Sequence, residues 1–243
     1  MGKSRTTPTR ETHKYADRDR LDQREEGREN RDGEDRDKLD QREPREALLH
    51  ALLDQSLVGH FAFVEHGQPR VMPIAIVRDG SDILLHGSTG SPWMRLLSTG
   101  VPVALSVAEL DAIVVARSAF ESSMRFRSAV LFGTCSTVVD SEKAAALDLV
   151  TDGLVPGRSA EVRPSTAREL AATLVLRMSV EEWSLKVSDG WADDGAPDIA
   201  GDAWAGVVPL RRGHENPQPA PDLRAGIPVA PSVMTLVQGY SPE

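Results

Sequence analysis

The segment from His86 to Pro92 combines the residue types that bind an anion at the start of a helix. Gly87 and Gly90 favour backbone conformations that turn successive N–H groups to one side, and the hydroxyls of Ser88 and Ser91 add donors. Serine followed by proline is typical of a helix start, and the positive end of that helix would point toward the bound group. The sequence predicts an anion site here; the alternative is an ordinary turn between a strand and a helix.

The other residues with catalytic potential form no recognisable constellation. Cys135 is the single cysteine, which excludes an internal disulfide framework and a cysteine-rich zinc site. The histidines show no metal-ligand spacing, and no metal site is predicted. His86 is a weak candidate for general acid or base chemistry, because the pKa of an unperturbed imidazole lies near neutrality. Its alternatives are a ligand-positioning role and a buried structural role.

Charge is distributed unevenly along the 243 residues. Residues 1–44 hold 12 Lys and Arg against 13 Asp and Glu, whereas the rest of the chain holds 16 against 24 and carries most of the net charge of −9. This acidic balance argues against nucleic acid as a partner. No apolar run is long enough for a membrane span, and the N-terminus is charged where a signal peptide is apolar. We therefore expect a cytoplasmic protein with no membrane partner.

Composition predicts three parts. Residues 1–44 contain almost no large apolar side chains, which predicts a disordered charged extension. Within it the pattern of residues 19–25 recurs at 37–43, and this repeat is either a transient helix that docks on a partner or part of a solvated extension. Residues 45–190 can form a folded domain, and residues 191–243, rich in Pro, Gly and Asp, predict an irregular C-terminal wrap and tail.

The folded domain is predicted to consist of short antiparallel strands with a few inserted helices. The expected helices are 45–53, 91–99, 141–150 and 165–170. The expected strands are 58–65, 70–77, 82–86, 102–107, 112–116, 128–139, 173–178 and 182–187. This pattern indicates a β-dominated α+β fold built on a small barrel.

Several segments, in order along the chain, resemble the signatures of flavin-nucleotide-binding proteins related to pyridoxamine 5′-phosphate oxidase. The similar segments are residues 84–88, 114–120, 126–133, 204–210 and 226–228. The resemblance extends over residues 44–232 and includes the distantly related nitroimidazole-resistance proteins. It implies an antiparallel split β-barrel, and a homodimer that binds FMN between its subunits. FAD and haem are the alternative cofactors.

The resemblance implies that the flavin phosphate is held by His86, Gly87, Ser88 and Ser91. From a distant strand, Arg117 and Ser118 would bring a guanidinium and a hydroxyl to the same anion, since the donors of arginine match phosphate oxygens. Arg127 and Ser128 would contact the phosphate, the ribityl chain or the partner subunit. For each arginine the alternative is an ion pair with a nearby acid.

Along the flavin ring, the resemblance places the strand that contains Val71, Pro73 and Ile74. Its backbone could hydrogen-bond the polar edge of the ring while apolar side chains cover a face. Pro73 lacks a ladder donor, so it belongs at a sheet edge or a bulge. Lys186 would approach the flavin edge. The alternatives are an ordinary barrel strand and a solvated lysine.

The chain departs from the family pattern at three of these positions. Pro92 stands where a basic residue is common, and Glu121 and Ser122 stand where a pair of histidines is frequent. The change removes candidate proton donors and brings a negative charge toward an expected phosphate. Weaker flavin binding and a different ligand are both consistent with it.

The resemblance implies an FMN-dependent oxidoreductase that acts on a small-molecule substrate, with NAD(P)H or a reduced deazaflavin as electron donor. The hydride chemistry would belong to the flavin, and the protein would orient it. The alternative is a flavin- or haem-binding carrier or sensor without turnover.

Overall fold

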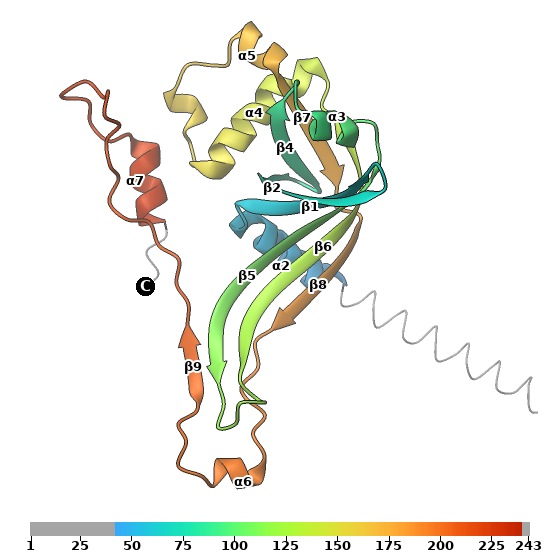
Figure 1. The fold of residues 1–243 in the computed structure, drawn as a ribbon. Helices are drawn as coiled ribbons and strands as arrows, with labels where there is room; N and C mark the ends of the chain where they lie inside the picture. Colours follow the sequence, from blue (N-terminus) through green and yellow to red (C-terminus); the bar gives the residue numbers. More distant parts are fainter. Residues whose placement is uncertain (1–41, 240–243) are drawn as a thin grey trace, which may run out of the picture. The chain divides into compact units, whose positions relative to one another are not determined.

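The computed structural model describes residues 42–239 (Figure 1). Helix α2 (Arg42–Gln55) includes residues 42–44, the last three residues of the predicted charged extension. Residues 1–41 of that extension lie outside the described residues. The chain divides into two compact units, residues 1–47 and 48–243. The second unit contains the sheet and includes the C-terminal half of α2.

In the part of the chain that the structure describes, all strands join one antiparallel sheet. The strands are β1 (Val58–Glu65), β2 (Gln68–Ala75), β3 (Val77–Asp79), β4 (Asp82–Ser88), β5 (Pro102–Val115), β6 (Ser123–Thr137), β7 (Thr173–Ser179), β8 (Glu182–Ser188) and β9 (Gly206–Pro209). Their order is β2-β1-β5-β6-β7-β4-β3, with β8 on β6 and β9 on β5. The predicted β-dominated antiparallel fold is confirmed.

The long strands β5 and β6 form a curved hairpin that links the two parts of the sheet (Figure 1). The sequence predicted two separate strands where β5 runs without interruption. The polar residues that indicated a break, Glu109 and Asp111, form ion pairs with Arg212 and Arg127, and a β-bulge lies between Leu110 and Ala112. Side-chain pairing over long sequence distance therefore allows the strand to continue.

The predicted helices are present as α2, α3 (Pro92–Leu97), α4 (Asp140–Leu154) and α5 (Ala167–Ala172). A short 3-10 helix, η1 (Ser159–Glu161), follows α4. The C-terminal wrap contains elements that the sequence did not predict: α6 (Ala196–Ile199), β9 and α7 (Pro231–Gln238). No described helix is long and apolar enough to cross a membrane.

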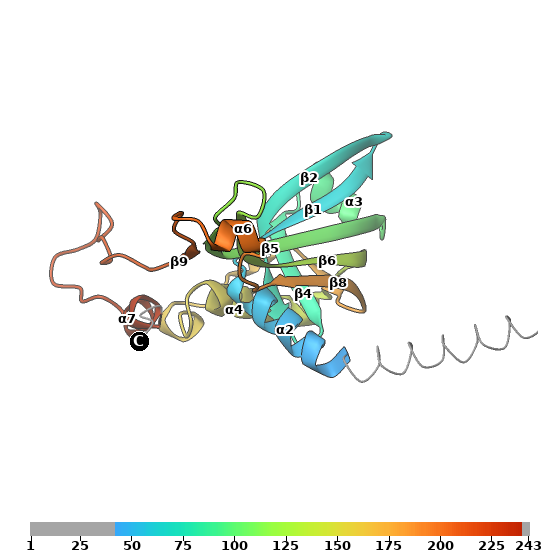
Figure 2. The ribbon, with the colours of Figure 1, turned by 90° about the horizontal axis from the view of Figure 1, so that it is seen from below.

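The main core lies between the sheet and the C-terminal half of α2, which lies on one side of β5, β6 and β8 (Figure 2). Leu49, Leu52 and Leu53 of α2 are buried against Phe61, Leu105 and Leu131 of the strands. A second, smaller cluster forms where α4 covers Leu84 and Val175. Burial of these side chains supplies the main driving force for folding.

The segment of residues 210–230, here called the C-terminal strap, connects β9 to α7 and is almost entirely exposed. Its beginning is fixed to β5, because the Leu210 amide donates to the Asp111 carbonyl (2.9 Å) and the Arg212 guanidinium pairs with Glu109 (2.8 Å). After its end, the Ser232 amide and hydroxyl donate to the Glu161 carboxylate. The strap is therefore tied to the domain at both ends.

Candidate functional site

One side of the sheet formed by β1, β2, β5, β6 and β8 is open in the part of the chain that the structure describes. We call this side the outer sheet face. Directly paired residues in neighbouring strands point to the same side, so the register defines its members. The central members are His60, Ala62, Val71, Pro73, Ala104, Ser106, Ala108, Ser128, Val130, Phe132, Ser184 and Lys186, all exposed or half-buried. The same register adds Glu182 opposite Phe132, and Leu110 with Phe126.

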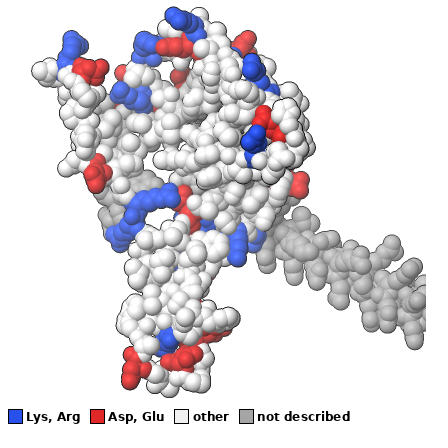
Figure 3. Space-filling model, viewed as in Figure 1, with Lys and Arg blue, Asp and Glu red and all other residues white. Residues whose placement is uncertain are grey.

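This face is unusually apolar for an exposed surface. Val71 is 60% exposed and Phe132 is 42% exposed, and several of their neighbours are alanines. Few charged side chains lie over β1, β5, β6 and β8 (Figure 3). Small side chains also leave the face flat, so that a planar ring or another sheet could approach it closely. Contiguous exposed apolar surface of this kind is typical of a binding site.

Four of the residues that the sequence predicted for the flavin site lie on this face. Val71 and Pro73 come from β2, a strand at the end of the sheet order, whereas Ser128 and Lys186 are direct partners on β6 and β8. The Lys186 ammonium lies 5.2 Å from the centre of the Phe126 ring. Ile74 points to the opposite side and packs against the core, so its side chain is not available to a ligand on this face.

His60 is a member of the outer sheet face that sequence analysis did not single out. It is paired with Pro73 on one side and Ser106 on the other, and the structure gives it no hydrogen bond or ion pair. Alternation along β1 contains the relevant signal, because Phe61 and Phe63 are buried and must place His60 on the other side. An exposed imidazole without a partner remains available to a ligand.

The turn after β4 does not have the geometry that the sequence predicted. Its amides are engaged within the protein: Thr89 donates to the Ala172 carbonyl (3.0 Å), Gly90 to the Ser88 hydroxyl (3.1 Å) and Ser91 to the Ser88 carbonyl (3.0 Å). Gly90 does not adopt a positive φ, and neither does Gly87. The predicted cradle of free amides is therefore absent from this turn, because the turn satisfies its own donors.

Ser91 keeps part of its predicted role. It precedes α3 as the N-cap residue, with Pro92 at the first helical position as predicted, and its hydroxyl makes no capping hydrogen bond. Arg95 follows one helical turn later on the same face of α3, and the structure gives it no partner. Arg70 lies opposite Phe63, whose ring stacks on that of Trp93 at a centroid distance of 6.4 Å. Arg70 is paired with Glu65 (3.2 Å), so among the described residues Ser91 and Arg95 are the side chains near the start of α3 that could contact an anion.

His86 and Gly87 point to different sides of β4. His86 is on the same side as Leu84, which packs in the cluster under α4, whereas a Cβ added to Gly87 would lie 3.1 Å from Met94 of α3. The His86 Nδ1 atom is buried without a hydrogen-bond partner. Burial also lowers the pKa of His86, so the ring is neutral at neutral pH. His86 therefore lies apart from the hydroxyl of Ser91.

Arg117 and Ser118 lie beyond the far end of β5, a strand of 14 residues that spans about 45 Å. Within one chain, Arg117 and Ser118 are therefore distant from the turn that follows β4. Arg117 pairs with Asp194 (3.0 Å), whose side chain is only 2% exposed, and its backbone amide donates to the same carboxylate. Ser118 accepts the Glu121 amide through its hydroxyl and the Ser122 hydroxyl through its carbonyl. Of the two roles expected for Arg117, phosphate binding and an ion pair with a nearby acid, the structure contains the ion pair.

Arg127 is also paired with an acid. Its Nε and Nη2 atoms donate to the two carboxylate oxygens of Asp111 (2.9 and 2.7 Å), and its Nη1 donates to Gln55 (2.8 Å). This hydrogen bonding raises the pKa of Arg127. Arg127 points away from Ser128 because neighbours along a strand face opposite sides. The two residues therefore do not act on one group.

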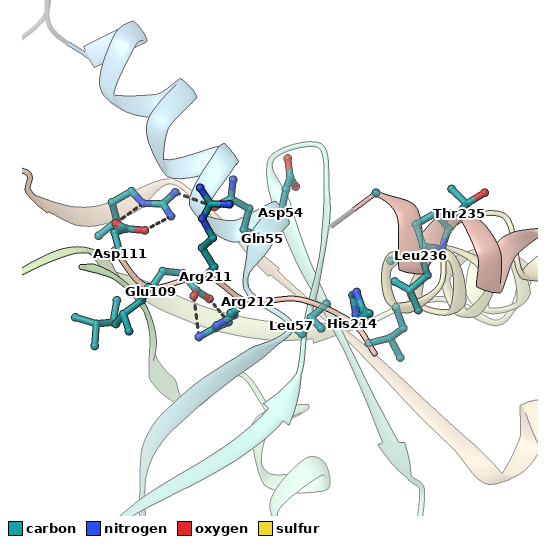
Figure 4. Close-up of a pocket in the computed structure, with 17 residues that line it drawn as sticks. Asp54, Gln55, Leu57, Glu109, Asp111, Arg211, Arg212, His214, Thr235 and Leu236 are labelled. Carbon is teal, nitrogen blue, oxygen red and sulfur yellow. Dashed lines mark hydrogen bonds and ion pairs between the residues drawn. The ribbon is translucent and has the colours of Figure 1, made fainter. Parts of the chain in front are cut away.

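Behind this part of β5 lies a cavity of about 630 Å³ (Figure 4). Its walls come from the end of α2, the middle of β5, the end of α4, the beginning of the strap, and α7. It opens on the side opposite the outer sheet face. No group of three or more potential metal ligands occurs among residues 42–239.

Comparison with known proteins identifies the fold. The pyridoxamine 5′-phosphate oxidase family matches residues 45–187. The chain belongs to this family. The fold is therefore the split β-barrel that the resemblance implied.

Two solved structures are similar over most of the chain. The FAD and haem binding protein from Mycobacterium smegmatis is 50% identical, with 79% of this chain and 94% of that chain covered and a TM-score of 0.77. The flavocytochrome Anf3 from Azotobacter vinelandii is 33% identical, with 76% and 87% covered and a TM-score of 0.71. A search of curated proteins found no match. The first of these proteins is named as a binder of FAD and haem, and the second is named as a flavocytochrome.

The residues of the outer sheet face fit a flavin ring. The face offers a flat apolar surface next to the lysine of β8 and the free backbone edge of β2. The phosphate donors differ from those predicted, because the turn amides are occupied and Arg117 is paired. A haem iron is commonly held by an imidazole nitrogen. Among the described residues, His60 is exposed without a hydrogen-bond partner, and the Nδ1 atom of His86 is buried without one.

Cys135 is excluded from chemistry at neutral pH. Its side chain is buried in the core, and burial raises the pKa of the thiol to about 12.

Proposed function

We propose that this protein binds a flavin on its outer sheet face and acts as a flavin-dependent redox protein. The supporting observation is the 50% identity to an FAD and haem binding protein over 94% of that chain, combined with an open apolar face that contains four predicted site residues. FAD is our first choice of cofactor on this similarity, and FMN, expected from the sequence, is the second.

In this proposal Val71 and Pro73 line one face of the flavin ring, and the unpaired edge of β2 supplies backbone hydrogen bonds to its polar rim. Lys186 on β8 lies four strands, about 19 Å, from β2. It would therefore approach a ring bound at β2 from a second copy of the chain, and there its positive charge would favour the reduced, anionic flavin. Ser91 and Arg95, near the start of α3, are the groups that would hold the phosphate. The flavin supplies hydride transfer when bound, and the chain orients it and excludes water from one face.

A second copy of the chain completes the site. An exposed apolar face this flat needs a cover, and a homodimer formed through it would enclose the ring on its other side. The predicted approach of Arg117 to the phosphate requires such a partner, because within one chain the two regions lie at opposite ends of β5. A small-molecule substrate and an NAD(P)H or deazaflavin donor complete the proposal; cytoplasmic location remains a prediction from the sequence.

Haem is a second cofactor candidate, favoured by the two similar structures. His60 and His86 are the two alternative histidines that would hold the haem; His60 lies on the outer sheet face and His86 on the α4 side of β4, so a single haem within one chain would be held by one of them. His50 and His214 are engaged in other interactions. A protein that binds both groups would pass electrons between them, whereas one that binds flavin alone would resemble the simpler members of the family.

The test is reconstitution of the purified full chain with FAD, FMN and haem. We expect flavin absorbance bands that persist after gel filtration, with the cofactor identified by chromatography after release. A haem titration should give a Soret band that is lost in one of the two variants His60→Ala and His86→Ala, and kept in the other and in His50→Ala. Absence of affinity for both flavins contradicts the proposal, and absence of a Soret band removes only haem.

Anaerobic mixing separates an enzyme from a carrier. We expect reduced nicotinamide or reduced deazaflavin to bleach the flavin absorbance of the loaded protein within seconds to minutes. Oxidised flavin that persists with every donor would favour the carrier or sensor function instead.

A further inference from the structure

The cavity behind β5 is separate from the proposed cofactor face. Glu109 and Arg127 line it, and both point to the side of the sheet opposite Ala108 and Ser128 of the outer sheet face. The sheet itself therefore lies between the cavity and a ligand bound on the outer face. The cavity size falls in the range of about 300–1,000 Å³ that small-molecule sites occupy.

The acids that line the cavity are all paired. Asp111 accepts two hydrogen bonds from Arg127, and Glu109 accepts two from Arg212 at 3.0 and 2.8 Å (Figure 4). Asp54 accepts two from Arg78, both at 2.7 Å. The carboxylates in the wall are thus neutralised by arginines and do not repel an anion.

Arg211 is the remaining cation of the wall. Among the described residues it has no ion pair or hydrogen bond, although it is the direct neighbour of the paired Arg212. Figure 4 shows it beside Gln55 at the end of α2, on the same side as the Arg127–Asp111 pair. The lining holds three acids and three arginines; because Asp54 is neutralised by Arg78 from outside the lining, Arg211 is left without an acid of its own. A guanidinium binds carboxylates through two parallel hydrogen bonds.

The rest of the wall is aliphatic. Leucine and proline residues from four segments of the chain line it: Leu57, Leu154, Pro156, Leu210 and Leu236. No described Phe, Tyr or Trp belongs to the lining, in which the imidazole of His214 is the one aromatic ring. Such a wall favours a flexible hydrocarbon over a planar ring that needs a stacking partner.

We propose that this cavity binds an amphipathic carboxylate, with its hydrocarbon among the leucines and its carboxylate on Arg211. The site is independent of the proposed cofactor function. Both the strap and α7 contribute to the wall, so a bound ligand would join the C-terminal segment to the barrel. Binding is therefore expected to raise the stability of the strap as well as that of the whole domain.

Isothermal titration of the full chain with decanoate tests the proposal. We expect decanoate to bind, and decyltrimethylammonium, which has the same tail and the opposite charge, not to bind. Arg211→Gln should weaken decanoate binding about tenfold, because a charge-assisted hydrogen bond to the carboxylate is lost. Arg224→Gln, which changes an exposed arginine of the strap outside the cavity, should leave binding unchanged.

A second variant tests the apolar part of the site. Leu236→Gln on α7 should weaken decanoate binding without affecting flavin binding. The proposal is overturned if decanoate does not bind, if both amphiphiles bind equally, or if Arg211→Gln and Arg224→Gln have the same effect. Loss of decanoate binding on addition of flavin would also overturn it, since the two sites would then not be separate. Failure of flavin to bind would leave these outcomes unaltered.

Discussion

The two sides of the β1–β5–β6–β8 sheet are made by alternate residues of the same strands, yet they differ completely in what covers them. On one side Phe61, Leu105 and Leu131 are fully buried under α2. On the other side Ala62, Ala104 and Val130 remain accessible, and no described segment packs over them. A sheet that keeps an apolar side open is built to be covered by something other than its own helices.

The comparison separates stability from binding. The side under α2 contains the large side chains that drive folding, so its substitutions should unfold the protein. The outer sheet face has small side chains and an unpartnered histidine, so its substitutions should affect a ligand or a second copy. The same strands therefore serve both purposes without conflict.

The largest expected effect is on the α2 side. Leu52→Ala should lower the free energy of unfolding by about 2–5 kcal/mol, because it leaves a cavity in the core. Urea denaturation followed by circular dichroism measures this. Val71→Ala on the outer face serves as control and should cost less than about 1 kcal/mol. Equal losses for the two variants would contradict the assignment of sides.

The ion pair at the end of the hairpin is expected to have the next largest effect. Arg117→Gln leaves the nearly buried carboxylate of Asp194 without its guanidinium, and should destabilise the protein by about 2–3 kcal/mol. Asp194→Asn in the same background should restore part of the loss in a double-mutant cycle. An effect on flavin affinity without an effect on stability would instead support the phosphate role predicted from sequence.

Replacement of an apolar residue by a charge on the outer face should change association. Phe132→Glu should raise the dissociation constant of the proposed homodimer at least about tenfold, since a charge would be buried at the interface. Light scattering at several concentrations measures the mass. A wild-type protein that is monomeric at all concentrations would exclude the second copy as the cover of this face.

The smallest effect concerns pH and the tie of the C-terminal segment. The hydroxyl and amide of Ser232 hold the pKa of Glu161 below its ordinary value. A depressed folded-state pKa means that the stabilisation is present at neutral pH and is lost as pH falls through that pKa. Proteolysis of the strap should therefore accelerate on going from neutral pH to about pH 3. Ser232→Ala should remove most of this pH dependence, and an unchanged profile in that variant would contradict the tie.

Local patterns predicted most of the barrel. Alternation identified β1, and Ser91 with Pro92 identified the start of α3. The strand predicted over 70–77 is divided into β2 and β3 in the structure. The continuous β5 was missed because its polar residues pair with Arg127 and Arg212, which are distant in sequence. The elements of the C-terminal wrap were missed because they are short and depend on pairing with β5 and on contacts with η1.

The candidate site was predicted in part. Strand register, which follows from alternation, brings Val71, Pro73 and Lys186 to one face. The roles of the turn amides and of Arg117 depend on hydrogen bonds to Ala172 and Asp194, and residue types alone do not reveal those partners. The sequence therefore indicated which residues could donate hydrogen bonds to a flavin phosphate. It did not reveal which of those donors are already paired within the folded protein.

Flavin affinity after insertion of a large side chain on the outer sheet face tests the central claim most directly. Ala104→Arg places a guanidinium in the middle of that face, and Ala145→Arg does the same on the exposed surface of α4. We predict that FAD binding, followed by quenching of flavin fluorescence, is at least about tenfold weaker in Ala104→Arg and unchanged in Ala145→Arg. Wild-type affinity in Ala104→Arg would contradict the account.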